Sequence, residues 1–553
     1  MKKNFLIFFM ICSLPLLVAN PLSKIYRNGD PILDSLRHIS IEAGILPQSS
    51  AGPLSGHDIL RQIDKLEVTD LDDDSLEELK SIKEKVAVPF STTPIEAQIT
   101  LSPEAYTNRD SSADEWDWVH RYNDRGPFLY AQAETILSDH IYGIVSYSLE
   151  KRLNEEDFSG GSINFPFMTS TSETQLQNSL PHTTFMGISG DRWSLVTGRD
   201  TLGWGGGNTG NLTIGNHVAY HDFIHASASN DLLRYTFLAI PMNSLDESGH
   251  AIIPSTNGTN WNTLFHGSLS RLYLAHRLEA EVLPWLRISL TEGTLFYTSR
   301  LDLRMLNPLM FLHNLQNFGE VNNSMTLEIE ASLSRRWFLN AQFFLDQFQT
   351  PGEVGAYAEE IPPNAYAGLV GLNYARTVPR GALKMYIEGV YTAPYVYLRA
   401  GDNTQNFDSE ENTEYNLDFV HAINMRYGRG SVAFLGYRYG PDTIVASTGL
   451  SFDHINGFGT FSNLSFFIQG SNGLMIEGEK DQHVETGPSE LNRPTPTGTP
   501  TYSLILELGG YVKLPDTRVR IYSRIDWINR WHANQYSTDT QLLIGAEYSL
   551  RIF

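Results

Sequence analysis

The sequence predicts an all-β fold, a transmembrane antiparallel β-barrel preceded by a small N-terminal helical region. Hydrophobic and polar residues alternate with a period of two from about residue 125 to the end of the chain. We count roughly 16 to 20 such runs, many about 9 to 12 residues long, which suits a bilayer-spanning strand better than a soluble one. Charged residues such as Glu328 and Glu330 recur deep inside the runs on the polar face, where a water-filled lumen tolerates them and a packed sandwich interior does not.

Residues 1–19 are expected to form a secretory signal peptide. Two lysines, Lys2 and Lys3, precede an apolar core that is too short for a stable membrane-spanning helix. The single cysteine, Cys12, lies inside this segment. The mature chain would then lack a thiol, which excludes disulfides, zinc–thiolate sites and cysteine catalysis.

Residues 20–90 are expected to form a helical region in the periplasm. In "DPILDSLRHISIEAGIL", Asp30 and Pro31 suit a helix start and Gly44 suits its end. "GPLSGHDILRQIDKLE" repeats the apolar spacing of a helix, and "TDLDDDSLEELKSIKEKV" begins with acidic residues and ends with basic ones, as the helix dipole favours. The aspartates also allow a calcium site, but they lack the glycine and the final glutamate of an EF-hand loop.

Residues 91–124 are expected to be a linker into the barrel. It contains "DEWDWVHRYNDRG", in which Trp116 and Trp118 stand among carboxylates and Arg121. Aromatic rings beside charged hydrogen-bonding groups are typical of sugar recognition, so these three residues are candidates for binding polysaccharide. The alternative is a pair of tryptophans that pack at the entrance of the barrel.

Residues 125–553 are expected to form the barrel itself. In "SMTLEIEASLSR", for example, Met325, Leu327 and Ile329 oppose Thr326 and Glu328. Aromatic residues lie near the ends of many runs, as in interfacial girdles, although ordinary core filling would also use them. Tight turns such as "YVKLPDTRVRIY" alternate with long polar loops such as "EGEKDQHVETGPSELNRPTPTGTP", and the chain ends in an amphipathic run. This asymmetry is typical of outer-membrane barrels.

The formal net charge of −23 argues against nucleic acid as a partner, since phosphate binding needs clustered Lys and Arg. The segment "SLVTGRDTLGWGGGNTGNLTIGN" contains the pattern G-x-G-x-x-G, but no helical sequence follows it, as a dinucleotide site would require. We therefore expect no cofactor. Glycines around Trp204 instead indicate a bend between strands in which the indole lies against the main chain.

This glycine-rich segment resembles the signature of the Wzi-type capsule-assembly family of outer-membrane proteins. Gly203 to Gly207, the Asn208-Thr209 step and the residues from Gly210 to Asn216 follow the family pattern, with Gly198 and Arg199 as its lead-in. Gly203 replaces a tryptophan, Gly206 a proline and Asn211 a serine of that pattern. The motif glycines are Gly198, Gly205, Gly207 and Gly210, and Arg199 and Trp204 join the candidates for polysaccharide binding.

The resemblance implies a barrel of about 18 strands in the outer membrane of a Gram-negative-type bacterium. It also implies a non-enzymatic protein, expected to be a monomer, that binds and anchors exported capsular or exopolysaccharide at the cell surface. Outer-membrane lipid and the capsule-export machinery are further expected partners.

Two other kinds of function stay open at this point. A passive porin would share the barrel, and an outer-membrane hydrolase could assemble its groups from separate strands, although no G-x-S-x-G or H-E-x-x-H motif is present. His217, His221 and His225 recur every four residues and could bind a metal. Hydrogen-bonded or solvated histidines are the commoner case, so we expect no metal site.

Overall fold

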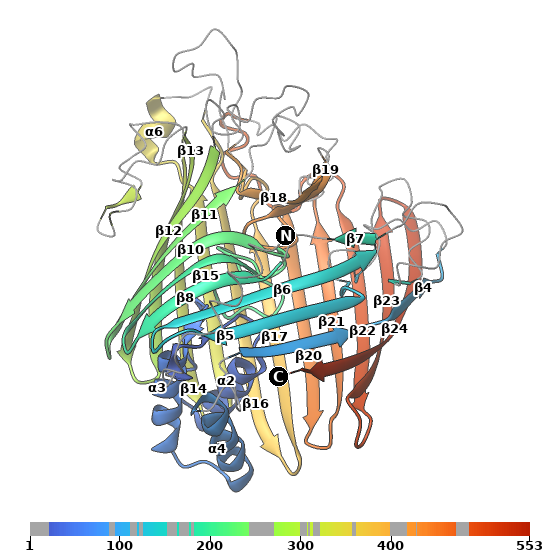
Figure 1. Ribbon diagram of the computed structural model, residues 1–553. Coiled ribbons are helices and arrows are strands. Elements are labelled where there is room, and N and C mark those ends of the chain that lie inside the picture. The colour runs from blue at the N-terminus through green and yellow to red at the C-terminus, as the bar shows by residue number, and fades with distance from the viewer. Residues whose placement is uncertain are drawn as a thin grey trace, which may run out of the picture.

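The computed structural model describes residues 21–87, 95–110, 119–120, 125–151, 163–164, 176–178, 182–242, 270–298, 307, 310–312, 321–356, 361–398, 417–426, 429–471 and 486–552. The expected signal peptide lies outside the described residues. The chain forms a barrel with helices gathered at one end (Figure 1).

The wall of the barrel is a single closed sheet in which each strand pairs antiparallel with its neighbours. The segments are β3 (Ile95–Leu101), β4 (Glu104–Asn108), β5 (Leu129–Ile136), β6 (Ile141–Lys151), β7 (Leu176–Asn178), β8 (Thr184–Gly190), β9 (Trp193–Asp200), β10 (His221–Ser229), β11 (Leu233–Met242), β12 (Ser270–Leu283), β13 (Leu286–Thr298), β14 (Val321–Ser334), β15 (Trp337–Gln347), β16 (Ala365–Val378), β17 (Gly381–Thr392), β20 (Thr443–His454), β21 (Phe458–Gln469), β22 (Thr501–Lys513), β23 (Val519–His532) and β24 (Gln535–Arg551).

Two of the strands are interrupted. β3 and β4 both pair with β24, and β7 and β8 both pair with β6, so each couple is one strand with a short irregular break. The barrel therefore has 18 strands, which confirms the predicted fold class.

The start of the barrel differs from the expectation. Residues 95–108 lie in the stretch expected to be a linker, 91–124, yet they form the strand that pairs with β24 and closes the sheet. Without this strand the barrel would have seventeen strands, and its first and last strands would meet in parallel. Antiparallel closure needs an even number, so residues ahead of 125 have to supply the missing strand.

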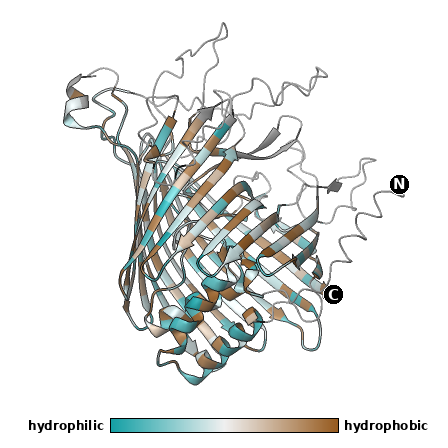
Figure 2. Cartoon of the chain, turned by 60° about the vertical axis from the view of Figure 1, so that its left-hand side comes forward, coloured by the Kyte–Doolittle hydropathy of each residue, from teal (hydrophilic) through white to brown (hydrophobic). Residues whose placement is uncertain are grey.

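The outer wall is apolar and the inner wall is polar, as the alternation predicts. On β14, Met325 and Leu327 are 46% and 40% exposed, whereas Thr326 and Glu328 between them are buried. Bands of opposite hydropathy alternate along the strands in Figure 2. This is the pattern of a barrel that faces lipid. Among the described residues, no helix is both long and apolar enough to cross a membrane.

The two ends of the barrel are unequal. Tight turns join β12 to β13, β14 to β15, β16 to β17 and β22 to β23 at one end, and the helices lie there (Figure 1). The connections from β11 to β12, from β17 to β20 and from β21 to β22 are much longer in sequence, and the strand ends that they join lie at the opposite end. In outer-membrane barrels the short turns face the periplasm.

The N-terminal helices form where the sequence predicts them. Helix α2 (Pro31–Ala43) has Asp30 as its N-cap, and Gly44 ends it in the left-handed conformation. Helix α3 (Gly56–Glu67) starts with a capping box between Ser55 and Asp58, and α4 (Asp73–Ala87) completes the group. Leucine and isoleucine side chains from all three helices form one buried cluster. A two-stranded sheet, β1 (Ile25–Tyr26) with β2 (Leu54–Ser55), precedes and links them.

The helical region docks on the barrel through ion pairs around the rim. Lys24 pairs with Glu134 of β5 over 2.8 Å, and Arg27 pairs with Asp200 of β9 over 2.6 Å. Lys65 reaches Glu281 of β12 over 2.8 Å. In addition, Glu42 of α2 accepts a hydrogen bond from the backbone N–H of Thr377 on β16. The barrel itself is thus the partner of this region within the chain.

Asp58 of α3 is the most strongly held of these carboxylates. Its carboxylate forms ion pairs with Arg234 of β11 over 2.7 Å and with Arg61 of its own helix over 2.6 Å. Burial opposes its ionisation, but the charges of Arg234 and Arg61 and the attached hydrogen bonds outweigh that effect and lower the pKa of Asp58 to about 2. Because an unfolded aspartate titrates near 3.9, ionised Asp58 contributes stability that is fully present above about pH 4.

Docking should therefore weaken as the pH falls from about 4 to 2. The Asp58→Asn variant should dock less tightly at neutral pH by about 3 kcal/mol, because Arg234 would lose its partner in a mostly buried site. It should also lose the pH dependence in that window. Limited trypsin cleavage of residues 21–87 at neutral pH, and pepsin cleavage at pH 2 to 4, would measure both effects.

The matched control is Glu67→Gln. Glu67 pairs with Lys83 within the helical region, and both side chains are about two-fifths exposed. This variant should leave docking unchanged, since exposed pairs contribute little. Equal resistance of the wild-type protein and the Asp58→Asn variant to protease cleavage would contradict the role of Asp58 in docking.

Candidate functional site

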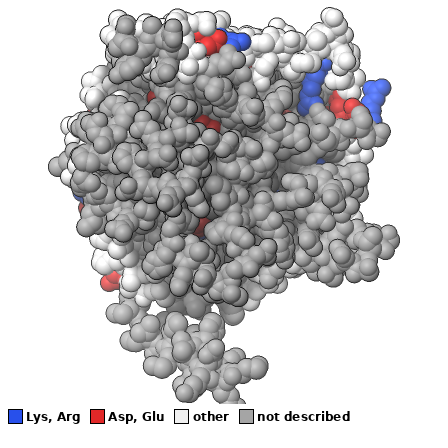
Figure 3. Space-filling view, turned by 90° about the horizontal axis from the view of Figure 1, so that it is seen from above, with Lys and Arg blue, Asp and Glu red and all other residues white. Residues whose placement is uncertain are grey.

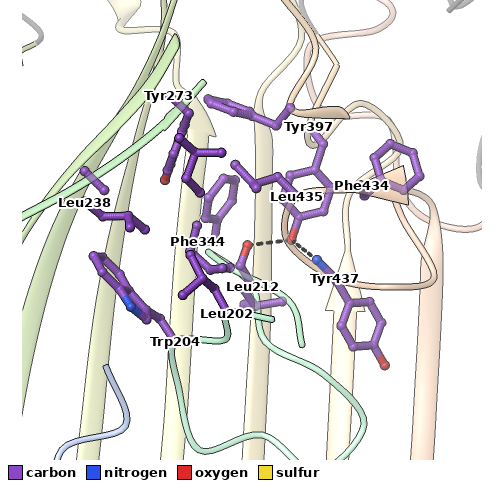
Figure 4. Close-up of a cluster of buried hydrophobic side chains, with 14 of the residues drawn as sticks. Leu202, Trp204, Leu212, Leu238, Tyr273, Phe344, Tyr397, Phe434, Leu435 and Tyr437 are labelled. Atoms are coloured by element: carbon purple, nitrogen blue, oxygen red, sulfur yellow. Dashed lines mark hydrogen bonds between the residues drawn. The ribbon is translucent and has the colours of Figure 1, made fainter. Parts of the chain in front are cut away.

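The glycine-rich segment enters the barrel. Residues 201–220 leave the end of β9, turn into the lumen and return to the start of β10 (Figure 4). Trp204 is only 1% exposed, and it packs in a buried cluster with Leu202, Leu212 and Leu238. Its backbone N–H donates to Ile214 O over 3.0 Å, and its indole N–H lies 3.4 Å from Gly52 O. The indole therefore lies against main chain, as the sequence predicts.

The motif glycines are needed for the course of this loop. Gly205 has φ +127°, and Gly198 and Gly210 also have positive φ angles, which other residues rarely adopt. At Gly207, an added Cβ would collide with the carbonyl oxygen of Gly210. The glycines make a compact fold inside the lumen rather than a cradle for phosphate.

Hydrogen bonds tie this loop to the barrel wall. Glu388 of β17 accepts the backbone N–H groups of Asn208 and Thr209, each over 2.7 Å. Gln342 of β15 accepts the Leu212 N–H over 2.9 Å. The loop is thus bound to the inner wall through its main chain and also through its side chains: the Thr209 hydroxyl donates to Glu388 over 2.5 Å, and the Thr213 hydroxyl lies 2.7 Å from that of Thr326.

Three later segments complete a lumenal plug, which we define as residues 201–220, 393–398, 417–426 and 429–442. The Tyr397 hydroxyl donates to Leu212 O over 2.8 Å and accepts from the Tyr437 N–H over 3.0 Å (Figure 4). Gly215 N–H donates to Leu435 O over 2.7 Å. Tyr397, Phe434 and Tyr437 are almost fully buried. Segments more than 200 residues apart in sequence therefore form one apolar core inside the barrel.

Charged side chains beside the plug are paired rather than hydrated. Arg277 of β12 contacts Glu279 and Glu328 over 2.7 Å each, and Arg287 of β13 contacts Glu330 over 2.8 Å. These side chains are 1–4% exposed. Strand charges were expected to face water in the lumen. On this side of the barrel opposite charges replace water, and the N-terminal region contacts the group: Ser49 donates to Glu279 over 2.8 Å, and Arg287 donates to Pro47 O over 2.7 Å.

The three histidines of the four-residue repeat separate in space. The His221 ring lies 5.1 Å from that of His421 in the plug, and the His225 ring meets Trp204 edge-on at 6.4 Å. Both His221 and His225 are fully buried. Within the described ranges, no group of three or more His, Cys, Asp or Glu residues is arranged to hold a metal ion.

Arg199 belongs to a polar and aromatic cluster at the junction of β9 and β10. It forms a double hydrogen bond with Asp222 over 2.7 and 2.8 Å, and its guanidinium lies 4.2 Å from the Tyr220 ring centre. His182 lies 5.2 Å from Tyr220. We call His182, Arg199, Tyr220 and Asp222 the side cluster. It lies where β9 ends and β10 begins.

A second cluster lies at the long-loop end and was missed from the sequence. Glu490 accepts hydrogen bonds from the Tyr395 hydroxyl over 2.6 Å and from Arg493 over 2.8 Å, and Asn364 donates to Asn492 over 2.9 Å. Arg493 is 36% exposed. We call these five residues the rim cluster. They come from three loops, so the one sequence signal that could have pointed to this cluster is the polar segment "ELNR" within a long loop.

The other predicted binding residues have different outcomes. Trp116, Trp118 and Arg121 lie outside the described residues. Trp204 is enclosed by the plug, so its indole offers no open face to a sugar ring in this structure. Seen from the long-loop end, the visible described Lys and Arg side chains lie toward the margin of the molecule (Figure 3).

The plug should depend on Glu388. In a Glu388→Gln variant one of the two backbone N–H groups of Asn208 and Thr209 loses its acceptor, and the charge on the acceptor is lost. We expect a loss of about 2 kcal/mol in stability and longer or more frequent conducting events in planar bilayers. Glu547→Gln is the control, because Glu547 is 35% exposed and lies 4.0 Å from its partner Arg520. Unchanged stability and conductance in Glu388→Gln would contradict the anchoring of the plug.

No family model matches the chain, and no curated protein matches it. Among solved structures the chain is similar to Wzi of Escherichia coli, an outer membrane protein involved in group 1 capsule assembly and a carbohydrate-binding β-barrel. The TM-score is 0.57 at 12% identity, over 95% of this chain and 98% of that one. OccAB4 of Acinetobacter baumannii matches with a TM-score of 0.38 at 11% identity, over 83% and 99% of the two chains. OprD of Pseudomonas aeruginosa matches with a TM-score of 0.38 at 8% identity, over 83% and 96%. At this identity the likeness to Wzi is one of fold: this chain has the architecture of an outer-membrane β-barrel.

Proposed function

We propose that this protein binds exported capsular or exopolysaccharide and anchors it at the surface of a Gram-negative-type bacterium, without catalysis. The observation that carries the proposal is the lumenal plug. A barrel that fills much of its own lumen with a hydrogen-bonded apolar core is poorly built for free diffusion. Its exposed groups at the long-loop end are then the surface most available for a ligand.

The described clusters have the chemistry that sugar recognition uses. Carboxylates and guanidinium groups form directional hydrogen bonds with hydroxyls, and aromatic rings pack on the apolar faces of sugar rings. The rim cluster presents Arg493 with Asn364 and Asn492, and the side cluster presents Arg199 with Tyr220. In each cluster the charged group is already held by a partner, so a ligand would meet an ordered surface.

Trp116, Trp118 and Arg121 remain candidates for the same role. Their stretch of sequence follows β4, which ends at Asn108 at the long-loop end of the barrel. The Asp539 side chain of β24 accepts the Arg109 and Asp110 N–H groups over 3.1 and 2.8 Å, so the chain is held to the inner wall just before this stretch. We further propose outer-membrane lipid as the environment of the apolar wall, and the capsule-export machinery as a partner at the short-turn end.

The fold likeness to Wzi supports this proposal over a passive porin, because Wzi is a carbohydrate-binding barrel. A porin would give stable conductance in the wild-type protein. A hydrolase would shorten purified polymer on incubation. We expect neither result.

Deleting the gene should leave polymer synthesis intact and release polymer into the medium. In the purified protein, Arg493→Ala and Arg199→Ala should each weaken binding to the organism's own surface polymer by about tenfold, the effect of losing about 1.4 kcal/mol. The first effect is measured as the amounts of cell-bound and released polymer in the deletion strain. The second is measured by biolayer interferometry with the purified variants.

Arg192→Ala is the matched control. Arg192 also pairs with an exposed aspartate, Asp231, but the pair lies at the short-turn end. This variant should bind polymer like the wild type. An unchanged amount of cell-bound polymer in a clean deletion would contradict the proposal. An equal loss of binding in all three arginine variants would contradict it too.

A further inference from the structure

The plug leaves one part of the inner wall accessible. Along β17 and β20 to β24, some inward side chains keep partial exposure: Arg524 and Glu507 are 21% and 19% exposed, against 1% and 2% for Arg277 of β12 and Glu328 of β14. The lumen is therefore divided into a filled side and a solvated side. We call the inner face of β17 and β20–β24 the open wall.

Four aromatic rings lie over glycines on this open wall. Each ring stands directly opposite its glycine on the neighbouring strand, and a Cβ on the glycine would collide with ring carbons. The pairs are Tyr386 with Gly449, Phe461 with Gly509, Tyr511 with Gly459, and Tyr522 with Gly545. Tyr511 and Tyr522 are also direct neighbours across β22 and β23. The four rings are partly exposed, so these aromatic surfaces lie within reach of the solvated lumen.

Polar groups fill the spaces between the rings. Asn463 accepts from the Tyr386 hydroxyl at 3.4 Å and donates to Glu507 at 3.2 Å. Arg524 pairs with Asp526 and Glu507, and the Tyr511 hydroxyl donates to Asp453 over 2.8 Å. Lys384 lies 3.8 Å from Asp453, so each of these three carboxylates has a basic partner on the same wall. Such a surface suits an uncharged ligand that combines apolar faces with many hydroxyls.

A cavity of about 320 Å³ separates this wall from helix α2. Its lining includes Arg37 and His38 of α2, Asn208 of the plug, and Tyr386, Ser451 and Asn463 of the wall. His38 is 3% exposed; its Nε2 lies 3.3 Å from Thr377 Oγ1, while its Nδ1 has no hydrogen-bond partner within the described part of the chain. The volume is at the small end of the range for small-molecule sites, about 300–1,000 Å³.

We propose that the open wall and this cavity form a binding site for a neutral saccharide segment inside the barrel. Aromatic rings would receive the apolar faces of the sugars, and Asn463 and the free His38 nitrogen would meet their hydroxyls. The site is distinct from the rim and side clusters and does not depend on binding at the cell surface. It lies at the end of the barrel that the helices cover.

Aromatic rings over glycines also stabilise sheets, so the test has to separate binding from folding. A chain carrying Cys12→Ser and Ser451→Cys would report access to the cavity through its rate of reaction with a thiol reagent. Maltohexaose should slow this reaction, and a Tyr511→Leu/Tyr522→Leu variant should reduce that protection by about fivefold. Asn463→Leu should also reduce it while leaving every ring–glycine pair in place.

Tyr273→Leu is the control for folding, since Tyr273 also covers a glycine, Gly293, but is 1% exposed on the filled side. The Tyr273→Leu variant should have a lower unfolding temperature, and maltohexaose should still slow its reaction with the thiol reagent. Absence of protection by maltohexaose in the parent chain would overturn the site. Equal loss in Tyr273→Leu would do the same, and stronger protection by a hyaluronan hexasaccharide would overturn the neutral class of ligand.

Discussion

The constraint behind this structure is that every polar group facing into the barrel needs a partner. Alternation along the strands sends half of the side chains inward, and many of them carry charge or an amide. Water would satisfy them in an open pore. Here the chain satisfies a large share itself, through ion pairs such as Arg277 with Glu328 and through backbone N–H groups that donate to Glu388 and Gln342. The plug meets this constraint, because its backbone N–H groups and the side chains of Asn208 and Thr209 supply donors to the inner wall.

The same constraint shapes both ends of the molecule. At the short-turn end, carboxylates of the strands pair with lysines and arginines of the helical region, so the helices are held against that end. At the long-loop end the charged groups stay partly exposed, as Arg493 does, and remain able to meet a ligand. The division of the lumen into a filled and a solvated side follows from the size of the plug. It packs against β8 to β17 and against the long-loop ends of β20 and β21, where the Tyr439 and Phe467 rings lie 4.7 Å apart, and it leaves other inward side chains of β17 and β20 to β24 partly exposed.

The sequence predicts the wall well and the interior poorly. Period-two alternation and turn chemistry are local, so the strands, the three helices and the Asp30 and Gly44 caps are all where the pattern places them. The strand at residues 95–108 was missed because it is short and interrupted at Pro103, and only the need for an even strand count reveals it. Trp204 was expected to be available to sugar, but nothing local shows that its indole would be buried against Gly52, Leu238 and His225. The rim cluster joins residues up to 129 positions apart, from Asn364 to Arg493, so no spacing in the sequence announces it.

The most direct test of this account is hydrogen–deuterium exchange in the membrane-embedded protein, followed at residues 201–220. The account holds that this loop is a fixed part of the barrel. The amides of Asn208, Thr209, Leu212 and Gly215 should then exchange as slowly as those of the central strands, since each donates to an acceptor inside the lumen. Exchange of these amides at the rate of an exposed loop would show that the lumen is not held closed in this way, and the anchoring proposal would lose its basis.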